Sequence, residues 1–159
     1  MNPIEIRFTI KEYKADELDR DEKKLIKLAM EAARKAYAPY STFRVGAALI
    51  TEDGQVFTGN NQENAAFPAG MCAERVALNY AMAQDPENKI IALAIVALRG
   101  DAFTESPVYP CGSCRQVLTE TEIRQNGPIK LIMAGENRIQ VTEKVSNLLP
   151  LNFSGAFLK

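Results

Sequence analysis

A near-continuous apolar run at residues 90–98 (IIALAIVAL) is the feature that most constrains the fold. Strands covered on both faces carry such runs, whereas strands with one solvated face alternate apolar and polar residues. We therefore expect residues 90–98 to form the central strand of a sheet that is covered on both faces. The run falls far short of the ~20 apolar residues that span a bilayer, so we expect no membrane partner.

Helix and strand patterns precede this run. Apolar residues at helical spacing predict an amphipathic helix over residues 19–37, which Pro39 ends. The Asp53-Gly54 pair favours a turn with positive φ. It predicts a hairpin between strands at residues 45–51 and 55–58.

The rest of the chain continues the alternation of helices and strands. Alternating apolar residues predict a half-buried or edge strand within the first ten residues. We further expect a loop at residues 59–71, a helix at 72–83, a helix that begins near Cys111, a buried strand at 129–134 and a short exposed strand at 138–141. This order indicates a mixed α/β layer fold, and we expect one domain over residues 1–159.

Composition narrows the function classes. The chain has 19 Lys+Arg and 20 Asp+Glu, so no excess of positive charge favours a phosphate backbone and we expect no nucleic-acid partner. Residues 1–14 lack the apolar core of a signal peptide, which leads us to expect a cytoplasmic protein. The absence of histidine excludes mechanisms that use imidazole as base or ligand. Carboxylates, thiolates or a metal ion must carry any catalysis.

Three cysteines give the strongest chemical signal. Cys111 and Cys114 lie about one helical turn apart, so both sulfurs face one point. A CxxC pair alone also suits a thiol-disulfide oxidoreductase, and zinc sites that only stabilise a fold close four positions with Cys and His. With Cys72 the chain offers three such ligands, which leaves one position for water, as in catalytic zinc sites, unless an Asp or Glu fills it.

Glu74 lies two residues after Cys72. If Cys72 binds a metal ion, a carboxylate at this spacing can take a proton from the bound water and deliver it to a substrate. The alternative is a favourable charge in the first turn of a helix. We expect the proton-carrying role.

Several ordered motifs resemble those of the zinc-dependent cytidine deaminases in their three-cysteine form. They are Cys72-Ala73-Glu74, PCGSCRQ at 110–116, Tyr40-Ser41 with FRVGAA at 43–48, NQENA at 61–65, and Leu148-Leu149-Pro150 with Phe153. The resemblance runs from about residue 37 to residue 153. It leaves out an N-terminal extension, residues 1–20, and the stretch 119–128.

The resemblance implies a three-layer α/β/α sandwich with a mixed central sheet. It implies one zinc ion per chain bound by Cys72, Cys111 and Cys114, with Glu74 as catalytic acid and base. The implied reaction is the hydrolysis of cytidine and 2′-deoxycytidine to uridine and 2′-deoxyuridine plus ammonia, a step of pyrimidine salvage. An enzyme of the same fold acting on another aminopyrimidine nucleoside, such as blasticidin S, would share the zinc motifs.

The resemblance also assigns substrate contacts. Asn61 and Glu63 would hydrogen-bond the sugar hydroxyls, Phe43 would pack against the pyrimidine, and Ala73 would contact the substrate. As alternatives, Phe43 is a core residue, and Asn61 and Glu63 are solvated loop residues. Because three thiolates around Zn²⁺ sum to −1, we expect Arg75 to offset this charge through a hydrogen bond to a ligand sulfur.

The last twelve residues contain six large apolar side chains: Leu148, Leu149, Leu151, Phe153, Phe157 and Leu158. Because a terminus is normally exposed, these side chains need cover, either from the chain's own sheet or from another subunit. The resemblance implies a homotetramer in which Phe153 approaches the active site of a neighbour.

Overall fold

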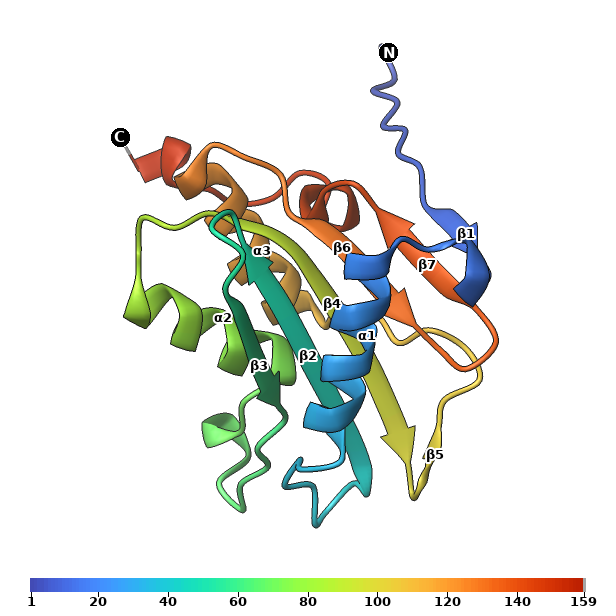
Figure 1. The fold of residues 1–159 in the computed structure, drawn as a ribbon. Coiled ribbons are helices and arrows are strands. Elements are labelled where there is room, and N and C mark those ends of the chain that lie inside the picture. Colours follow the sequence, from blue (N-terminus) through green and yellow to red (C-terminus); the bar gives the residue numbers. More distant parts are fainter. Residues whose placement is uncertain (159) are drawn as a thin grey trace.

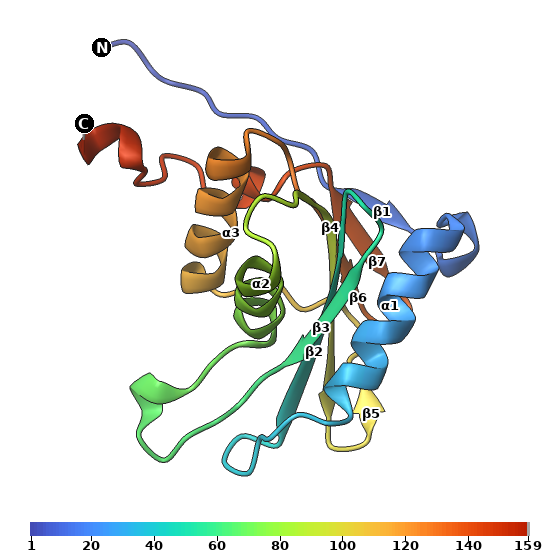
Figure 2. The same cartoon turned by 60° about the vertical axis from the view of Figure 1, so that its left-hand side comes forward.

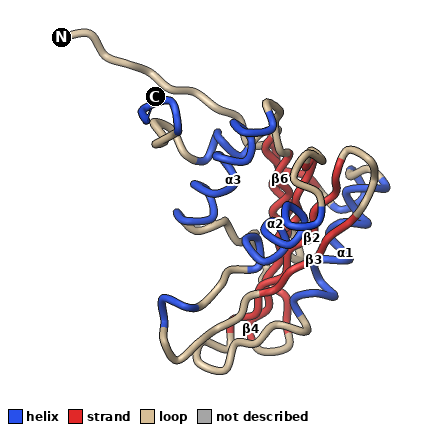
Figure 3. The backbone as a smooth tube through the Cα atoms, turned by 90° about the vertical axis from the view of Figure 1, so that its left-hand side faces the viewer, coloured by secondary structure: helices blue, strands red, loops and turns tan. Residues whose placement is uncertain are grey.

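A computed structural model describes residues 1–158, in which helices cover both faces of a mixed sheet (Figure 1). Helix α1 (Arg20–Ala33) lies on one face, and α2 (Ala73–Gln84) and α3 (Gly112–Gln125) lie on the other (Figure 2). Figure 3 shows the same layers with the strands between the helices. The three-layer α/β/α sandwich is therefore confirmed.

Seven strands form the sheet, in the order β1-β7-β6-β4-β2-β3, and β5 pairs with β4. Their bounds are β1 (Lys11–Tyr13), β2 (Phe43–Thr51), β3 (Val56–Asn60), β4 (Ile90–Arg99), β5 (Ala102–Phe103), β6 (Lys130–Ala134) and β7 (Ile139–Thr142). Strand β4 lies between β2, to which it is antiparallel, and β6, to which it is parallel. The apolar run thus forms the central strand, as predicted.

Two apolar cores lie on opposite faces of the sheet. In β4, Leu93 and Ile95 belong to the core beneath α2 and α3, whereas Ala94 and Val96 belong to the core beneath α1. Both sets are almost completely buried. This two-sided burial explains why the strand shows no alternation of apolar and polar residues.

The predicted hairpin joins β2 and β3, and Gly54 takes the positive φ of 85° that its turn requires. Helix α1 begins after Asp19, whose carboxylate accepts the Glu22 N–H at 2.8 Å. It ends at Ala33, before the predicted end at residue 37. The reason is tertiary pairing, because Tyr37 exchanges backbone hydrogen bonds with the loop after β3.

The first strand, β1, and the last strand, β7, differ from the predictions. Residues 1–10 are in no strand, and the edge strand is β1, which pairs with β7 only from Lys11 to Tyr13. The apolar residues before Lys11 have no neighbouring strand to pair with. Strand β7 was predicted to be exposed, yet three of its four residues are buried. It is buried because β1 and β6 flank it and the α1-side core contains Ile139 and Val141.

No helix within residues 1–158 has both the length and the apolar character needed to cross a bilayer.

Two helices begin at cysteine residues: α2 begins directly after Cys72, and α3 begins directly after Cys111. Both helices lie on the same face of the sheet (Figure 2). The helix starts predicted near residues 72 and 111 are confirmed.

Candidate active site

The first turns of α2 and α3 bring three cysteine side chains together. The sulfur atoms of Cys72, Cys111 and Cys114 all lie within 4.8 Å of one another, and the Cys72 and Cys111 sulfurs are 3.9 Å apart. Zinc–sulfur bonds of about 2.3 Å in a tetrahedral site place sulfurs roughly 3.8 Å apart. Cys114 is buried, Cys72 is half-buried and Cys111 is exposed. The donor set fits a zinc ion bound from one side, with a position left towards solvent.

Hydrogen bonds set different proton affinities within this cluster. The Cys114 thiol donates to the Cys72 sulfur and, with help from Arg75, lowers the pKa of Cys72 to about 5. The same bond to Cys72 raises the pKa of Cys114, and burial adds to the increase. Arg75 Nη2 lies 3.9 Å from the Cys72 sulfur, so the structure places this guanidinium where it can offset thiolate charge.

Glu74 occupies the first turn of α2 and is only 4% exposed. Burial raises the pKa of its carboxyl group, and the neighbouring Cys72 thiolate raises it further. A carboxylate that only interacts favourably with the helix dipole does not need to be buried, because burial of a charge costs free energy. A carboxyl group that binds its proton more tightly than usual, next to a metal-binding cluster, is suited to take up and release a proton during a reaction.

A cavity of about 810 Å³ opens beside the cysteines. Its wall comes from the start of α2 and α3, from residues 40–41 and from the loop after β3. It is lined by Tyr40, Ser41, Asn61, Gln62, Glu63, Asn64, Ala65, Phe67, Pro68, Gly70, Met71, Cys72, Arg75, Cys111 and Ser113. Asn61, Glu63 and Arg75 were named from the sequence. The other non-cysteine residues of the wall were given no role.

Other predicted substrate contacts lie outside this wall. Ala73 is fully buried between Cys72 and Glu74. Phe43 is half-buried at the start of β2, where the Arg99 guanidinium lies 6.0 Å from the centre of its ring. The structure therefore places both residues next to the site without bringing them into the cavity lining.

Asn61 holds the start of β2 in place. Its side-chain oxygen accepts the Val45 N–H at 2.7 Å, and its amide nitrogen donates to the Phe43 carbonyl at 3.0 Å. These two bonds fix the orientation of the amide, because its donor and acceptor ends each have a backbone partner. One N–H and one oxygen lone pair remain for a ligand.

Glu63 is fixed by the turn that precedes β2. Its Oε2 accepts the N–H groups of Tyr40 at 2.9 Å and of Ser41 at 3.3 Å, and its Oε1 accepts the Ser41 hydroxyl. The Ser41 hydroxyl is the main cause of a lowered pKa of the Glu63 carboxyl group. Sequence reasoning named the Tyr40-Ser41 pair as part of a motif but gave Ser41 no role.

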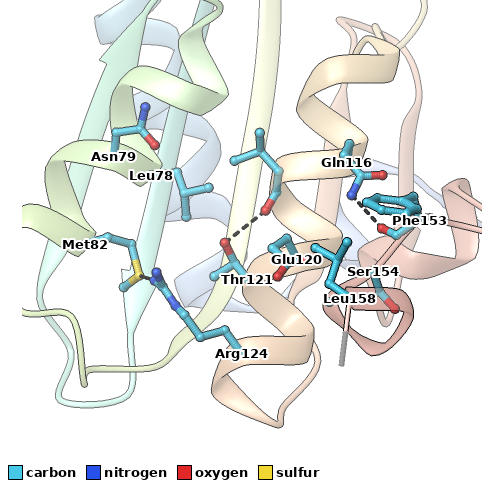
Figure 4. A pocket seen from close by; sticks show the side chains of 12 residues that line it. Leu78, Asn79, Met82, Gln116, Glu120, Thr121, Arg124, Phe153, Ser154 and Leu158 are labelled. Atoms are coloured by element: carbon cyan, nitrogen blue, oxygen red, sulfur yellow. Dashed lines mark hydrogen bonds between the residues drawn. The ribbon is translucent and has the colours of Figure 1, made fainter.

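Phe153 lies away from the cavity, in the groove between α2 and α3. Its carbonyl accepts a hydrogen bond from Gln116 Nε2 at 2.8 Å, and its ring stacks on Phe157 with 5.8 Å between ring centres. Figure 4 shows Phe153 and Leu158 beside α3, across a groove of about 440 Å³ from Leu78 and Met82 of α2. Phe153 is thus outside the cavity of its own chain, and its side chain is exposed.

Comparisons with known proteins agree with this geometry. Residues 19–126 match the family model of the cytidine and deoxycytidylate deaminase zinc-binding region. A cytidine deaminase of Sporosarcina psychrophila is 42% identical over 134 residues, which cover 84% of this chain and 92% of that protein. One of Halalkalibacterium halodurans is 47% identical over 100 residues, 63% of this chain and 71% of that protein.

The fold comparison gives a similar result. The crystal structure of a cytidine deaminase from Burkholderia pseudomallei matches with a TM-score of 0.71 and 39% sequence identity. The match covers 86% of this chain and 100% of the Burkholderia chain. The family model begins at residue 19 and ends at residue 126. The similarity therefore starts earlier than the motifs indicated, and it includes most of the stretch 119–128 that they left out.

Proposed function

The chain belongs to the zinc-dependent cytidine and deoxycytidylate deaminase family, and we propose that it hydrolyses cytidine and 2′-deoxycytidine to uridine and 2′-deoxyuridine. The observation that carries this function is the cluster of three cysteine sulfurs within 4.8 Å of one another, adjacent in the chain to a buried carboxyl group. The cavity beside the cluster provides space for a nucleoside. A cytoplasmic role in pyrimidine salvage is part of the same proposal.

Cys72, Cys111 and Cys114 would hold the zinc ion, one per chain. When bound, zinc lowers the pKa of a water molecule towards neutrality, so that the water can act as a nucleophile. The protein offsets the charge of three thiolates in two ways. The N-termini of α2 and α3 carry partial positive charge, and Arg75 lies beside the Cys72 sulfur.

Glu74 is the proposed proton carrier. Its carboxylate accepts a proton from the attacking water and later gives a proton to the departing amine. In the overall reaction a C–O bond forms at the ring carbon, the exocyclic C–N bond breaks, and one water is consumed for each ammonia released. The raised pKa of Glu74 suits both directions of this transfer.

Asn61 and Glu63 are the proposed sugar ligands. Both line the cavity, and both are held by backbone hydrogen bonds before any substrate arrives. A carboxylate such as Glu63 can accept hydrogen bonds only, so it fits a sugar hydroxyl, which free cytosine lacks. Phe43 packing on the pyrimidine and Ala73 contacting the substrate complete the proposal.

We also propose that the protein is a homotetramer. Leu151, Phe153, Phe157 and Leu158 are 60–88% exposed in the single chain. Phe153 and Leu158 line the groove between α2 and α3 (Figure 4), so this face of the chain presents exposed apolar side chains. Such surfaces are normally buried between subunits. In the proposed assembly Phe153 approaches the cavity of a neighbouring subunit.

An ultraviolet assay with purified protein tests the function. We expect cytidine and 2′-deoxycytidine to be converted with one ammonia released per turnover, whereas cytosine and CMP should be poor substrates. Failure to turn over either nucleoside, with zinc bound, would overturn the proposal. A thiol-disulfide oxidoreductase would instead reduce a protein disulfide in a parallel assay and need no zinc.

A further inference from the structure

The turn before β2 has an unusual backbone. Thr42 has a φ of 55°, a region that β-branched residues rarely adopt, and its N–H donates to the Ala38 carbonyl at 3.1 Å. In the same turn, the consecutive N–H groups of Tyr40 and Ser41 both donate to one oxygen of Glu63. Backbone strain of this kind persists where the surrounding structure holds it, commonly near functional sites.

The direction of the Ser41 hydroxyl follows from its other contact. The N–H of Phe43 donates to Ser41 Oγ at 3.0 Å, so Oγ acts as an acceptor there. The single hydroxyl hydrogen is then available for Oε1 of Glu63. The result is a chain of hydrogen bonds that runs from the Phe43 backbone through Ser41 to the Glu63 carboxylate. Each bond in such a chain strengthens the next.

Counting acceptor positions shows what remains free. An ionised carboxylate has about four lone-pair positions. The two N–H groups occupy those of Oε2, and the Ser41 hydroxyl occupies one on Oε1. One position on Oε1 is left, on a side chain that lines the cavity.

We propose that Ser41 is a positioning residue for sugar recognition, which fixes the Glu63 carboxylate so that its free lone pair on Oε1 accepts one substrate hydroxyl. This inference rests on the proposed function, in which Glu63 binds the sugar. It adds the residue that decides how Glu63 is presented. The lowered pKa of Glu63, caused mainly by the Ser41 hydroxyl, keeps the carboxylate ionised as this role requires.

The test compares Ser41→Ala, the conservative Ser41→Thr, and Ser106→Ala as a control at an exposed serine. Each variant is assayed with cytidine and with 2′,3′-dideoxycytidine, which lacks both ring hydroxyls. Dideoxycytidine is measured as a competitive inhibitor if its turnover is too slow. Binding of uridine is measured by calorimetry, and zinc content and thermal midpoint verify that each variant is folded.

We expect Ser41→Ala to raise KM for cytidine and Kd for uridine by about tenfold, the size of one charge-assisted hydrogen bond. The kcat for cytidine and the values for dideoxycytidine should stay within about twofold, because the lost contact concerns the hydroxyl only. Ser41→Thr should restore most of the affinity. The same substitution in a Glu63→Gln background should have no further effect on KM.

Two results would overturn the role of Ser41. Equal losses on both substrates would mean that Ser41 acts through the Phe43 backbone instead of Glu63, and unchanged KM and Kd in Ser41→Ala would mean that it has no positioning role. A failure of the proposed function looks different. In that case the wild-type protein itself would neither turn over cytidine nor bind uridine.

Discussion

A Cβ atom on Gly59 would lie 2.5 Å from the carbonyl oxygen of Ala73, which shows that β3 contacts the first turn of α2 without any side chain between them. Ala73 separates Cys72 from Glu74. The backbone of the sheet therefore sets the position of the turn that carries a metal-binding cysteine and the buried carboxyl group. Glycine at this position in β3 is required by the close approach of the helix.

Gly59→Ala should weaken both the fold and the site. The added methyl group meets helix backbone at less than contact distance, so α2 must shift. Overpacking of this kind costs about 1–3 kcal/mol of unfolding free energy. We expect a lower thermal midpoint and a clear loss of bound zinc or of kcat. Gly127→Ala, where a Cβ meets only atoms 3.8 Å away, is the control. Wild-type stability, zinc content and kcat in the Gly59→Ala variant would show that this contact does not hold α2 in place.

Glu74→Gln should separate proton transfer from metal binding. Gln keeps the size of the side chain but cannot accept the proton of the water. We expect kcat to fall by at least about 10²–10⁴-fold while zinc remains bound. Glu87→Gln, at an exposed position, should have no effect. Near-normal turnover by Glu74→Gln would show that Glu74 only contributes a favourable charge in the first turn of α2.

Glu122 is predicted to be a structural carboxylate. It is 8% exposed, and it accepts the N–H groups of Ile129 at 2.8 Å, Val145 at 2.7 Å and Ser146 at 3.0 Å. Gln at this position replaces one accepting oxygen by an amide that faces a backbone N–H. We expect a loss of about 2 kcal/mol, or roughly 4–8 °C in thermal midpoint. Glu136→Gln is the exposed control, and equal midpoints for the two variants would contradict the assignment.

Removal of residues 151–159 should reduce oligomer mass and activity together. Two exposed apolar side chains of this segment, Phe153 and Leu158, line the α2–α3 groove, where Gln116 donates a hydrogen bond to the Phe153 carbonyl. Light scattering and the cytidine assay should be run on the same samples. Phe153→Ala serves as the milder variant and should lower activity more than mass. An active monomer of the intact protein would refute the assembly.

The sequence predicted the elements whose signals are local. The apolar run of β4, the Asp53-Gly54 hairpin and the starts of α2 and α3 are where patterning and turn chemistry placed them. Strands β1 and β7 were predicted less well, because the length of β1 and the burial of β7 depend on the pairing of these two strands, which lie far apart in the chain. β1 is only as long as its pairing with β7 allows, and β7 is buried because β1 lies outside it.

The same division applies to the site. The three cysteines were predicted to lie together because their spacing within two short segments is itself informative, and the structure places their sulfurs within 4.8 Å of one another. The proton-carrying role of Glu74 was predicted from its position two residues after Cys72 and stays a prediction. The proposed role of Ser41 was not predicted, because its contact with Glu63 spans 22 positions and lies in a turn where Thr42 takes a positive φ. Neither the distance across the chain nor that backbone conformation is visible in residue types alone.

Zinc titration of the metal-free protein tests the central claim most directly. Bound zinc and the rate of cytidine deamination are measured on the same samples as zinc is added in steps, for the wild type and for Cys114→Ser. The account predicts a rate that rises with bound zinc and levels off at one equivalent per chain, and a variant that retains little zinc and little activity. Full-rate deamination by metal-free protein, or full zinc occupancy in Cys114→Ser, would contradict it.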